Sequence, residues 1–156
     1  QGRRWQADRL FENGTLFGAV SEKNGTVLRK NLLENPPPPL AATAFPGIFA
    51  SERYGLDGYA VAAPPGRYDI RLYFSEAFEG VKNRGQRVFS VAVNDRTLTE
   101  SFDPMARGGA HFTPVTLTAN DVAPVNGRIK IRFHQSPLSS QAPQINGIEI
   151  VRAQKP

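Results

Sequence analysis

Aromatic side chains are the residues of this sequence whose types and positions could carry chemistry. Phe17, Tyr54, Tyr59 and Phe78 fall in expected turns or just after expected strands, where core packing does not require an aromatic ring. A ring in a loop can stack on the apolar face of a sugar, while neighbouring polar groups bind the sugar hydroxyls. Local packing of the loops is the alternative reason for these rings, and the sequence leaves both interpretations open.

Catalytic and metal-binding groups are sparse. The chain has no cysteine, which excludes disulfides, thiol catalysis and cysteine-based zinc sites. His111 and His134 lie in separate expected strands, without the spacing of a metal site. A glycosidase needs two carboxylates, and the candidates are Glu76, Glu79, Glu100, Asp103 and Glu149. We predict that the domain is not an enzyme, and a small polysaccharide-cleaving enzyme is the least favoured alternative.

Short β-strands are the elements that must position these residues. In residues 67–75 every second side chain is apolar, which is the period of a half-buried strand. The same alternation predicts strands over residues 86–95, 111–119, 127–134 and 145–152. Turn-forming Gly, Pro and Asn residues separate these segments. The only expected helix is a short turn near residues 76–81.

Many short alternating strands without crossover helices predict an all-β fold, an antiparallel two-sheet β-sandwich of jelly-roll type. The chain has 156 residues, which is the size of one domain, and we expect residues 1–156 to form a single domain. Pro36 to Pro39 are four consecutive prolines, which cannot join a central strand. We expect these prolines to form a long surface loop.

The net charge of +5 permits an acidic partner, such as a uronic-acid polysaccharide. The basic residues are scattered and form no consecutive block, so we expect no nucleic-acid partner. No segment approaches the roughly 20 apolar residues that a membrane-spanning helix requires, so we expect no membrane span.

Several segments occur in an order that resembles the malectin family. They are "ASERYG", "YDIRLYFSEAF", "GQRVFSVAVND", "SFDPMARGGA" and "PQINGIEIV", and "WQADRLFENG" is similar to the family's tryptophan–aspartate opening. No single segment is specific, but the combination covers most of the chain after Trp5. The family includes malectin-like modules of bacterial carbohydrate-active enzymes. The resemblance therefore implies a jelly-roll sandwich that binds carbohydrate without cleaving it.

The resemblance also implies a set of binding residues. Tyr54 agrees with a binding tyrosine of the family, and Phe17 falls near the place of another. After "FSE" the family often has two adjacent aromatic residues, whereas this chain has Phe78 followed by Glu79. An acidic residue before the last strand is missing, and Gln141 is one of two glutamines that could replace it. Malectin itself binds short glucose oligomers. These departures fall on the ligand contacts, so the resemblance supports the fold more strongly than it supports that specificity.

We therefore predict a non-catalytic carbohydrate-binding module that holds sugar rings at one end of the sandwich, as part of a larger carbohydrate-active protein. The predicted ligand-binding residues are Tyr54, Phe78, Phe17, Glu79, Asp57, Tyr59 and Gln141. A protein-interaction or adhesion domain on the same fold is the alternative. We expect no cofactor, with a structural calcium ion left open, and an extracellular or periplasmic location, as in an exported bacterial protein.

The start of the chain also differs from the family pattern. Family members usually begin with a short strand before the tryptophan–aspartate segment, and this sequence starts almost at Trp5. A missing edge strand would leave unpaired backbone groups, which is a possible place for self-association.

Overall fold

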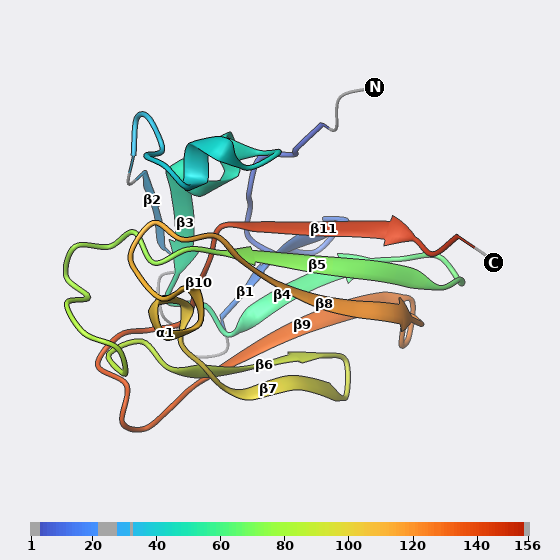
Figure 1. Cartoon of the computed structure of the whole chain (residues 1–156). Coiled ribbons are helices and arrows are strands. Elements are labelled where there is room, and N and C mark those ends of the chain that lie inside the picture. The colour runs from blue at the N-terminus through green and yellow to red at the C-terminus, as the bar shows by residue number, and fades with distance from the viewer. Residues whose placement is uncertain (1–3, 22–27, 32, 155–156) are drawn as a thin grey trace.

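A computed structural model of the chain describes residues 4–21, 28–31 and 33–154, and in it two antiparallel sheets face each other (Figure 1). The larger sheet has the strand order β1 (Phe17–Val20), β4 (Gly58–Ala62), β9 (Arg128–Gln135), β6 (Phe89–Val93) and β7 (Arg96–Phe102). The smaller sheet has the order β11 (Gly147–Arg152), β5 (Tyr68–Phe74) and β8 (Val115–Val122). The predicted antiparallel β-sandwich is confirmed.

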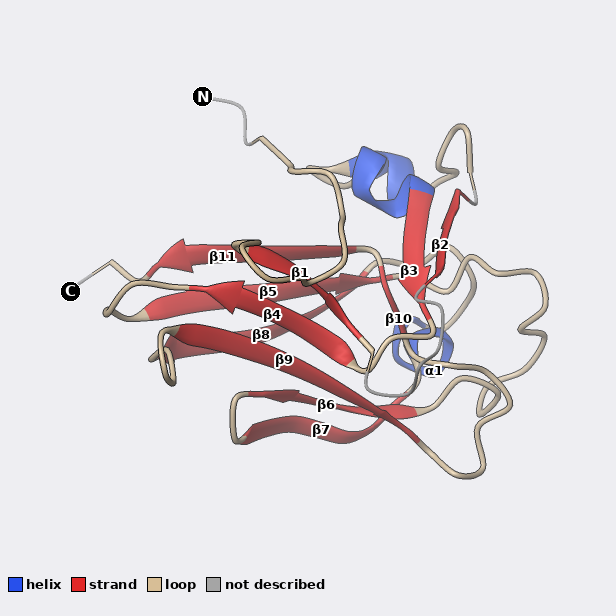
Figure 2. Ribbon diagram, turned by 180° about the vertical axis from the view of Figure 1, so that it is seen from behind, coloured by secondary structure: helices blue, strands red, loops and turns tan. Residues whose placement is uncertain are grey.

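A third, smaller sheet closes one end of the sandwich. Its strand order is β10 (Gln144–Ile145), β3 (Ser51–Tyr54) and β2 (Leu28–Asn31). Two short 3₁₀ helices accompany it, η1 (Leu40–Ala42) and η2 (Pro46–Ala50). In Figure 2 these helices and β3 rise at one end of the sandwich, on the side of β11. The third sheet and the two 3₁₀ helices therefore form a wall at one end of the smaller sheet.

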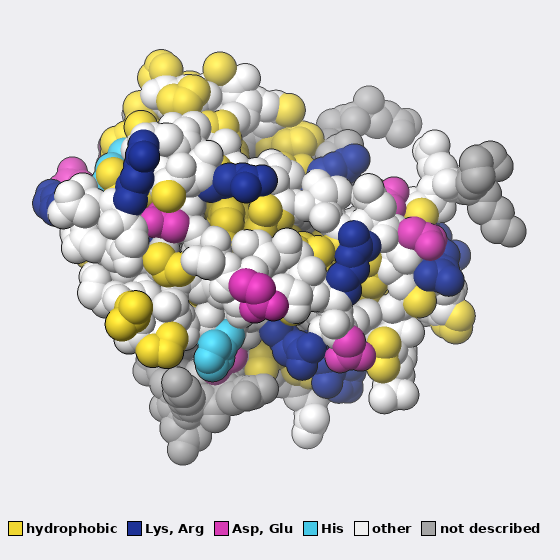
Figure 3. All heavy atoms as spheres, turned by 60° about the horizontal axis from the view of Figure 1, so that its bottom comes forward, with side chains coloured by type: hydrophobic (Ala, Val, Ile, Leu, Met, Phe, Trp, Pro, Cys, Tyr) yellow, Lys and Arg dark blue, Asp and Glu magenta, His cyan; other side chains and the backbone are white. Residues whose placement is uncertain are grey.

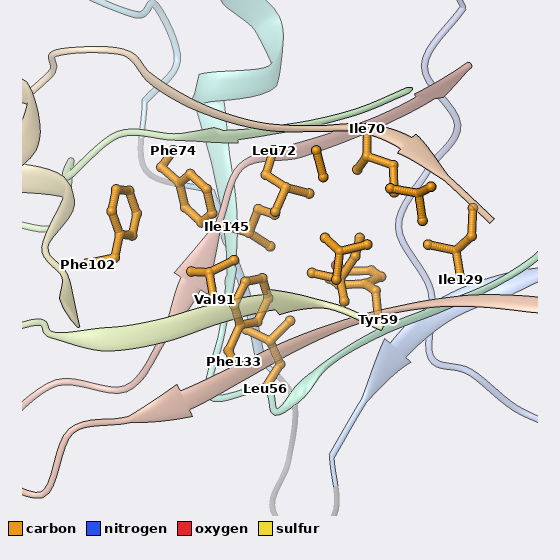
Figure 4. Close-up of a cluster of buried hydrophobic side chains, with 14 of the residues drawn as sticks. Leu56, Tyr59, Ile70, Leu72, Phe74, Val91, Phe102, Ile129, Phe133 and Ile145 are labelled. Carbon is orange, nitrogen blue, oxygen red and sulfur yellow. The ribbon is translucent and has the colours of Figure 1, made fainter. Parts of the chain in front are cut away.

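The alternating pattern of the strands explains why both sheets form. In β5 the side chains of Ile70, Leu72 and Phe74 are fully buried, and the residues between them are half-buried. Figure 4 shows Phe74 and Leu72 on the side of Val91 and Phe133 of the other sheet, and Ile70 on the side of Tyr59 and Ile129. Since burial of each large apolar side chain stabilises the fold by about 1.5–3 kcal/mol, the two inner faces hold the sheets together.

Four phenylalanines from different strands form an aromatic cluster within this core. They are Phe74, Phe89, Phe102 and Phe133. The rings of Phe74 and Phe102 meet edge to face with their centroids 4.7 Å apart, and those of Phe89 and Phe133 with theirs 5.7 Å apart. Such pairs contribute about 0.5–1.5 kcal/mol beyond the area they bury. The cluster therefore fixes the strand ends from which the loops around residues 75–88 and 103–114 leave the sandwich.

The helix expected near residues 76–81 is wrong, because these residues form turns and loop. The short helix α1 (Pro104–Gly108) lies elsewhere. Asp103 caps its N-terminus, and the Asp103 carboxylate accepts a hydrogen bond from the Ala106 amide at 3.0 Å. It ends at Gly109, whose φ of 90° favours glycine. The proline run at residues 36–39 lies between β2 and η1.

Candidate ligand-binding groove

A groove of about 830 Å³ opens along one side of the sandwich, where β1 and β11, the edge strands of the two sheets, lie apart. Inward-facing residues of β1, β4 and β11 form its floor, and the N-terminal segment, residues 4–8, runs over it. The helix η2 and the strand β3 close one end. We call this cleft the lateral groove. Its position means that a ligand there would touch the side chains between the two sheets.

Trp5 provides the largest partly exposed aromatic surface in the lateral groove. Its ring is 37% exposed and meets Phe45 and Tyr73 edge to face, with centroid distances of 5.3 and 5.8 Å. A Cβ added at Gly147 would lie 3.6 Å from Trp5 and 3.3 Å from Ile48, so the absence of a side chain there lets both come close to β11. The indole is thus held at the rim by neighbours on two sides.

Asp8 ties the N-terminal segment to the wall of the lateral groove. Its carboxylate accepts hydrogen bonds from the Arg53 guanidinium and from the Tyr59 hydroxyl, the latter at 2.9 Å. Arg53 belongs to β3 and Tyr59 to β4, so one carboxylate joins three parts of the chain. Because Asp8 follows Trp5 by three residues, this contact also positions the indole.

Tyr59 should make the stability of the fold sensitive to alkaline pH. Burial, together with the negative charge of Asp8, raises the pKa of the Tyr59 hydroxyl above its ordinary value of about 10. The unfolded chain therefore loses this proton first, and the stabilisation is fully present below pH ~10 and lost as the pH rises further. We expect a loss of about 1.4 kcal/mol per pH unit from this group.

Urea unfolding of the wild type and of Tyr59→Phe across the alkaline range measures this contribution. At neutral pH the variant should be about 1 kcal/mol less stable, because it lacks the hydrogen bond to Asp8. The difference should shrink with rising pH, since only the wild type has a buried hydroxyl to ionise. Two parallel curves would show that Tyr59 does not carry the effect.

A second set of polar contacts lies behind the indole. The Glu149 carboxylate on β11 accepts hydrogen bonds from the Arg71 guanidinium at 3.1 Å and from the Tyr73 hydroxyl at 2.8 Å. Glu149 is 8% exposed and Arg71 is more open to solvent. Since Tyr73 also contacts Trp5, this group supports the ring that faces the groove.

The predicted site residues divide between two places. Phe17 and Tyr59 line the lateral groove. The Phe17 ring is half-buried at the start of β1, with the Arg9 guanidinium 4.7 Å from its centroid. The expectation that Tyr59 lies in a turn or just after a strand, outside the core, is wrong, because it is a buried residue of β4 and is 8% exposed.

The other predicted residues lie at the end of the sandwich closed by the third sheet. They are Tyr54, Phe78, Glu79, Asp57 and Gln141. Tyr54 is half-buried at the end of β3, opposite Gln144 of β10, and Asp57 lies between β3 and β4. Phe78 is half-buried and Glu79 exposed in the loop after β5, and Gln141 is half-buried in the loop before β10. Their role in binding stays a prediction.

A buried ion pair joins the loops that carry Phe78 and Gln141. The Arg87 guanidinium donates to the Glu76 carboxylate at 2.7 Å, and the two side chains are 2% and 0% exposed. Arg87 also donates to the carbonyl oxygen of Ala142, and the Phe78 amide donates to Glu76 at 3.1 Å. These contacts bring three segments together that are separate in the sequence.

Sequence reasoning missed most of the lateral groove. Trp5 was noted only as part of a family segment, and Phe45 and Asp8 were not assigned a role. The one available signal is that Trp5 is the only tryptophan of the chain. A lone tryptophan close to a polar Gln-Ala-Asp sequence has no core pattern around it. The other lining residues come from strands far apart in the sequence, and no local pattern marks them.

The carboxylates that could serve a glycosidase are largely occupied by structural contacts. Glu76 binds Arg87, and Glu149 binds Arg71 and Tyr73, as described above. Asp103 accepts the Ala106 amide and, at 2.6 Å, the Gly85 amide. In the described residues no three His, Cys, Asp or Glu side chains are grouped so that they could hold a metal ion. Within the same residues no helix is long and apolar enough to cross a membrane.

The strand order and the lateral groove define this chain as a β-sandwich domain with an aromatic-lined cleft on one side. The chain belongs to the Malectin domain family, because the sequence model of that family matches residues 1–148. The resemblance noted in the short sequence segments is thereby confirmed.

Similar curated proteins are plant receptor proteins. Receptor-like protein 4 of Arabidopsis thaliana is 25% identical over 160 residues, which cover 96% of this chain and 24% of that protein. A putative receptor-like protein kinase of the same plant is 31% identical over 96 residues, which cover 57% of this chain and 11% of that protein. The chain thus spans a quarter or less of the length of these relatives.

Solved structures with a similar fold come from a bacterium and from plants. A calcium-binding mutant of Bacteroides uniformis β-glucuronidase 2 matches with a TM-score of 0.73 and 22% identity, over 96% of this chain and 16% of that chain. A chain in the crystal structure of the plant peptide RALF23 in complex with FER and LLG2 matches with a TM-score of 0.61 and 19% identity, over 95% of this chain and 42% of that chain. The ANXUR2 extracellular domain from Arabidopsis thaliana matches with a TM-score of 0.61 and 18% identity, over 91% and 40%. These identities show a shared fold alone.

Proposed function

We propose that this domain binds carbohydrate without cleaving it, and that the lateral groove holds the sugar. The observation that carries the proposal is the partly exposed Trp5 ring in a cleft that is lined by apolar residues of the strands and by polar residues such as Arg4 and Gln6. A volume of about 830 Å³ falls within the usual range of small-ligand sites. Phe17 and Tyr59 of the predicted set belong to this cleft.

The lining supplies both kinds of contact that a sugar ring needs. The indole of Trp5 and the ring of Phe17 offer π-faces to the C–H groups of the ring. Arg4 and Gln6, both exposed on the segment that crosses the groove, offer donors to hydroxyl groups. Sugar recognition by such pairs of aromatic and polar groups requires no acid or base.

Binding without catalysis is also supported by the carboxylates. Three of the candidates bind neighbouring side chains or amides, so they are held in structural roles. A glycosidase instead needs two carboxyl groups facing one sugar, about 5–10 Å apart. An extracellular location fits the proposal, since the similar ANXUR2 structure is an extracellular domain. We propose that the chain acts as a binding module of a larger protein.

A protein or peptide partner is the second candidate function. β11 lies at the edge of its sheet, paired with β5, and its residues 147–151 line the lateral groove. An edge strand offers backbone groups to which an extended peptide can add as a further strand. The similarity to the FER complex with the plant peptide RALF23 favours the same reading.

Binding assays with Trp5→Ala test both candidates. The wild type is run by affinity electrophoresis against soluble glucans, xylans and pectins, and in parallel against a library of unstructured peptides. We expect retention by a glycan, and about tenfold weaker binding for Trp5→Ala, since aromatic contacts contribute about 0.5–1.5 kcal/mol beyond buried area. The melting temperature should change little, because Trp5 is partly exposed.

Two further variants locate the site. Tyr54→Ala and Phe78→Ala change the aromatic residues at the end of the sandwich and leave the groove intact. They should bind as the wild type does. Loss of binding in these variants, with Trp5→Ala unaffected, would move the site to the loops predicted from the sequence. Retention by peptides alone would replace carbohydrate binding by the second candidate function.

A further inference from the structure

The outer face of the larger sheet carries a row of cations on β9. Arg128, Lys130 and Arg132 are exposed and alternate with the buried residues Ile129 and Ile131. Alternate residues of a strand lie about 7 Å apart on one face, so the three cations are evenly spaced. Figure 3 brings the lower layer of Figure 1 forward and shows several Lys and Arg side chains, in dark blue, on this face.

The strand next to β9 places no large side chain beside this row, and at its Arg128 end the guanidinium lies 5.1 Å from the centroid of the Phe11 ring. In the register between β4 and β9, the residues opposite Arg128, Lys130 and Arg132 are Ala62, Ala60 and Gly58. Their side chains are a methyl group or a single hydrogen atom. The cations therefore stand above a flat neighbouring strand, with no large side chain of β4 to shield them.

A hollow of about 280 Å³ lies at the end of this row nearest the β6–β7 and β8–β9 turns. The three cations line it on one side. The turns contribute the remaining lining residues, which are Asn94, Asp95, Val125 and Asn126. Three cations thus face one carboxylate, and the Asp95 carboxylate lies 3.4 Å from the Arg132 guanidinium. The hollow is positively charged, with an acceptor at its rim.

Asn94 holds the hollow in shape. Its side-chain amide donates to the Ala123 carbonyl at 2.9 Å, and its side-chain oxygen accepts from the Lys130 amide at 2.9 Å. Its own backbone amide donates to the Lys130 carbonyl at 2.7 Å. A φ of 50° places this residue in the left-handed region, where asparagine is tolerated. One side chain therefore fixes both turns against β9 before any ligand arrives.

We propose that this hollow is a second site, separate from the lateral groove, that binds an acidic sugar unit of a polysaccharide. Lys130 and Arg128 would hold the carboxylate or sulfate group of that unit. Asp95 and Asn126 at the rim would bind its hydroxyl groups. The row of cations along β9 would attract the next charged units of the same chain.

The lining distinguishes an acidic sugar from other polyanions. Single-stranded nucleic acids bind through aromatic rings that stack on successive bases. None of the residues lining this hollow is aromatic, and the neighbouring Phe11 ring already packs against the Arg128 guanidinium. A membrane surface requires apolar side chains that enter the lipid, and Val125 is the only large apolar residue of the lining. The Asp95 carboxylate can accept hydrogen bonds from hydroxyl groups, of which a sugar unit has several, whereas a phosphodiester group has no donor to offer it.

Affinity electrophoresis with polygalacturonate tests the second site, with a neutral galactan as the reference polymer. The variant Arg128→Gln/Lys130→Gln removes two cations of the hollow. The matched control Lys82→Gln/Arg107→Gln removes two exposed cations elsewhere and has the same net charge. We expect the first variant to bind polygalacturonate about tenfold more weakly, since exposed charge pairs contribute up to about 1 kcal/mol each. The control should bind within about twofold of the wild type, and added salt should weaken the wild type.

Each other outcome overturns the proposal. Equal losses in both double variants would show attraction by net charge without a site, and no loss in the first variant would remove the hollow. Tighter binding of single-stranded DNA or of anionic vesicles, with the same dependence on Lys130, would reassign the hollow to that partner. Trp5→Ala should still bind polygalacturonate through the hollow. The carbohydrate-binding proposal for the lateral groove and the proposal for the hollow can therefore fail independently, and the two variants distinguish these outcomes.

Discussion

Arg87→Leu is expected to lower the free energy of unfolding by about 3–5 kcal/mol, because it leaves the buried Glu76 carboxylate without its guanidinium partner. Urea unfolding at neutral pH measures the loss. The change should be among the largest of any single substitution, since both side chains are almost fully buried and Arg87 also binds the Ala142 carbonyl. Hydrogen exchange in the loops around residues 75–88 and 136–143 should accelerate as well.

Two controls separate the buried charge from the loss of a side chain. Arg84→Leu removes an exposed arginine that donates to the Gly109 carbonyl, and it should change stability by no more than about 0.5 kcal/mol. Arg87→Met/Glu76→Leu removes both charges and should be more stable than Arg87→Leu alone. The double variant could instead be as unstable as the losses of Arg87→Met and Glu76→Leu added together. In that case the two side chains would stabilise the fold through their other hydrogen bonds and not through the ion pair.

Asp8→Ala should destabilise the fold and disable the lateral groove together. We expect a loss of about 2–4 kcal/mol, because one carboxylate binds a guanidinium and a buried hydroxyl. The N-terminal segment would lose its contact with β3 and β4, and Trp5 would no longer be fixed at the rim. Glycan binding should therefore fall by at least tenfold, more than in Trp5→Ala. Thermal unfolding and affinity electrophoresis on the same samples measure both effects.

Glu12→Ala is the matched control for this prediction. Glu12 is an exposed residue four positions after Asp8, and its hydrogen bonds with the Thr15 hydroxyl are made by its backbone. This variant should keep both stability and binding. If Asp8→Ala lost stability but bound glycans normally, the N-terminal segment would not need Asp8 to stay over the groove.

Strands with one buried face could be predicted closely from the sequence. β5 and β9 begin and end within one residue of the segments with clean alternation, because every second side chain enters the core. Tyr59 was misread because the residues around it, "GYAVAA", are small or apolar on both faces and hide the period. Ala60 faces outward and is nevertheless 5% exposed, so burial on both sides removes the polar signal.

The position of the helix could have been predicted as well. Asp103 followed by Pro104 is a common start of a helix, and the Gly108-Gly109 pair a common end. The segment near residues 76–81, which was expected to be helical, has neither signal in this order. Glu76 in that segment has the opposite role, since its buried pair with Arg87 fixes an irregular loop.

The lateral groove could not be predicted from local patterns. It combines Trp5, Tyr59 and Glu149, which are far apart in the sequence and meet only after both sheets have formed. Asp8 and Arg53 are charged residues that a sequence reading places at the surface, yet their ion pair is partly buried at the wall of the groove. The predicted ligand-binding residues divide between the lateral groove and the loops at the end of the sandwich for the same reason, because no local sequence pattern shows which strands and loops come together in the fold.

The floor of the lateral groove has a consequence for the thermodynamics of binding. Ile145 and Tyr59 line it and also belong to the hydrophobic core, so no rigid layer separates a bound ligand from the interior. A ligand there would bind the folded chain alone, and at a hundred times its dissociation constant it would raise the free energy of unfolding by about 2.7 kcal/mol. Ligand binding and folding would then be linked. The fraction of lateral grooves that hold a ligand would determine how often the two sheets separate between the edge strands β1 and β11.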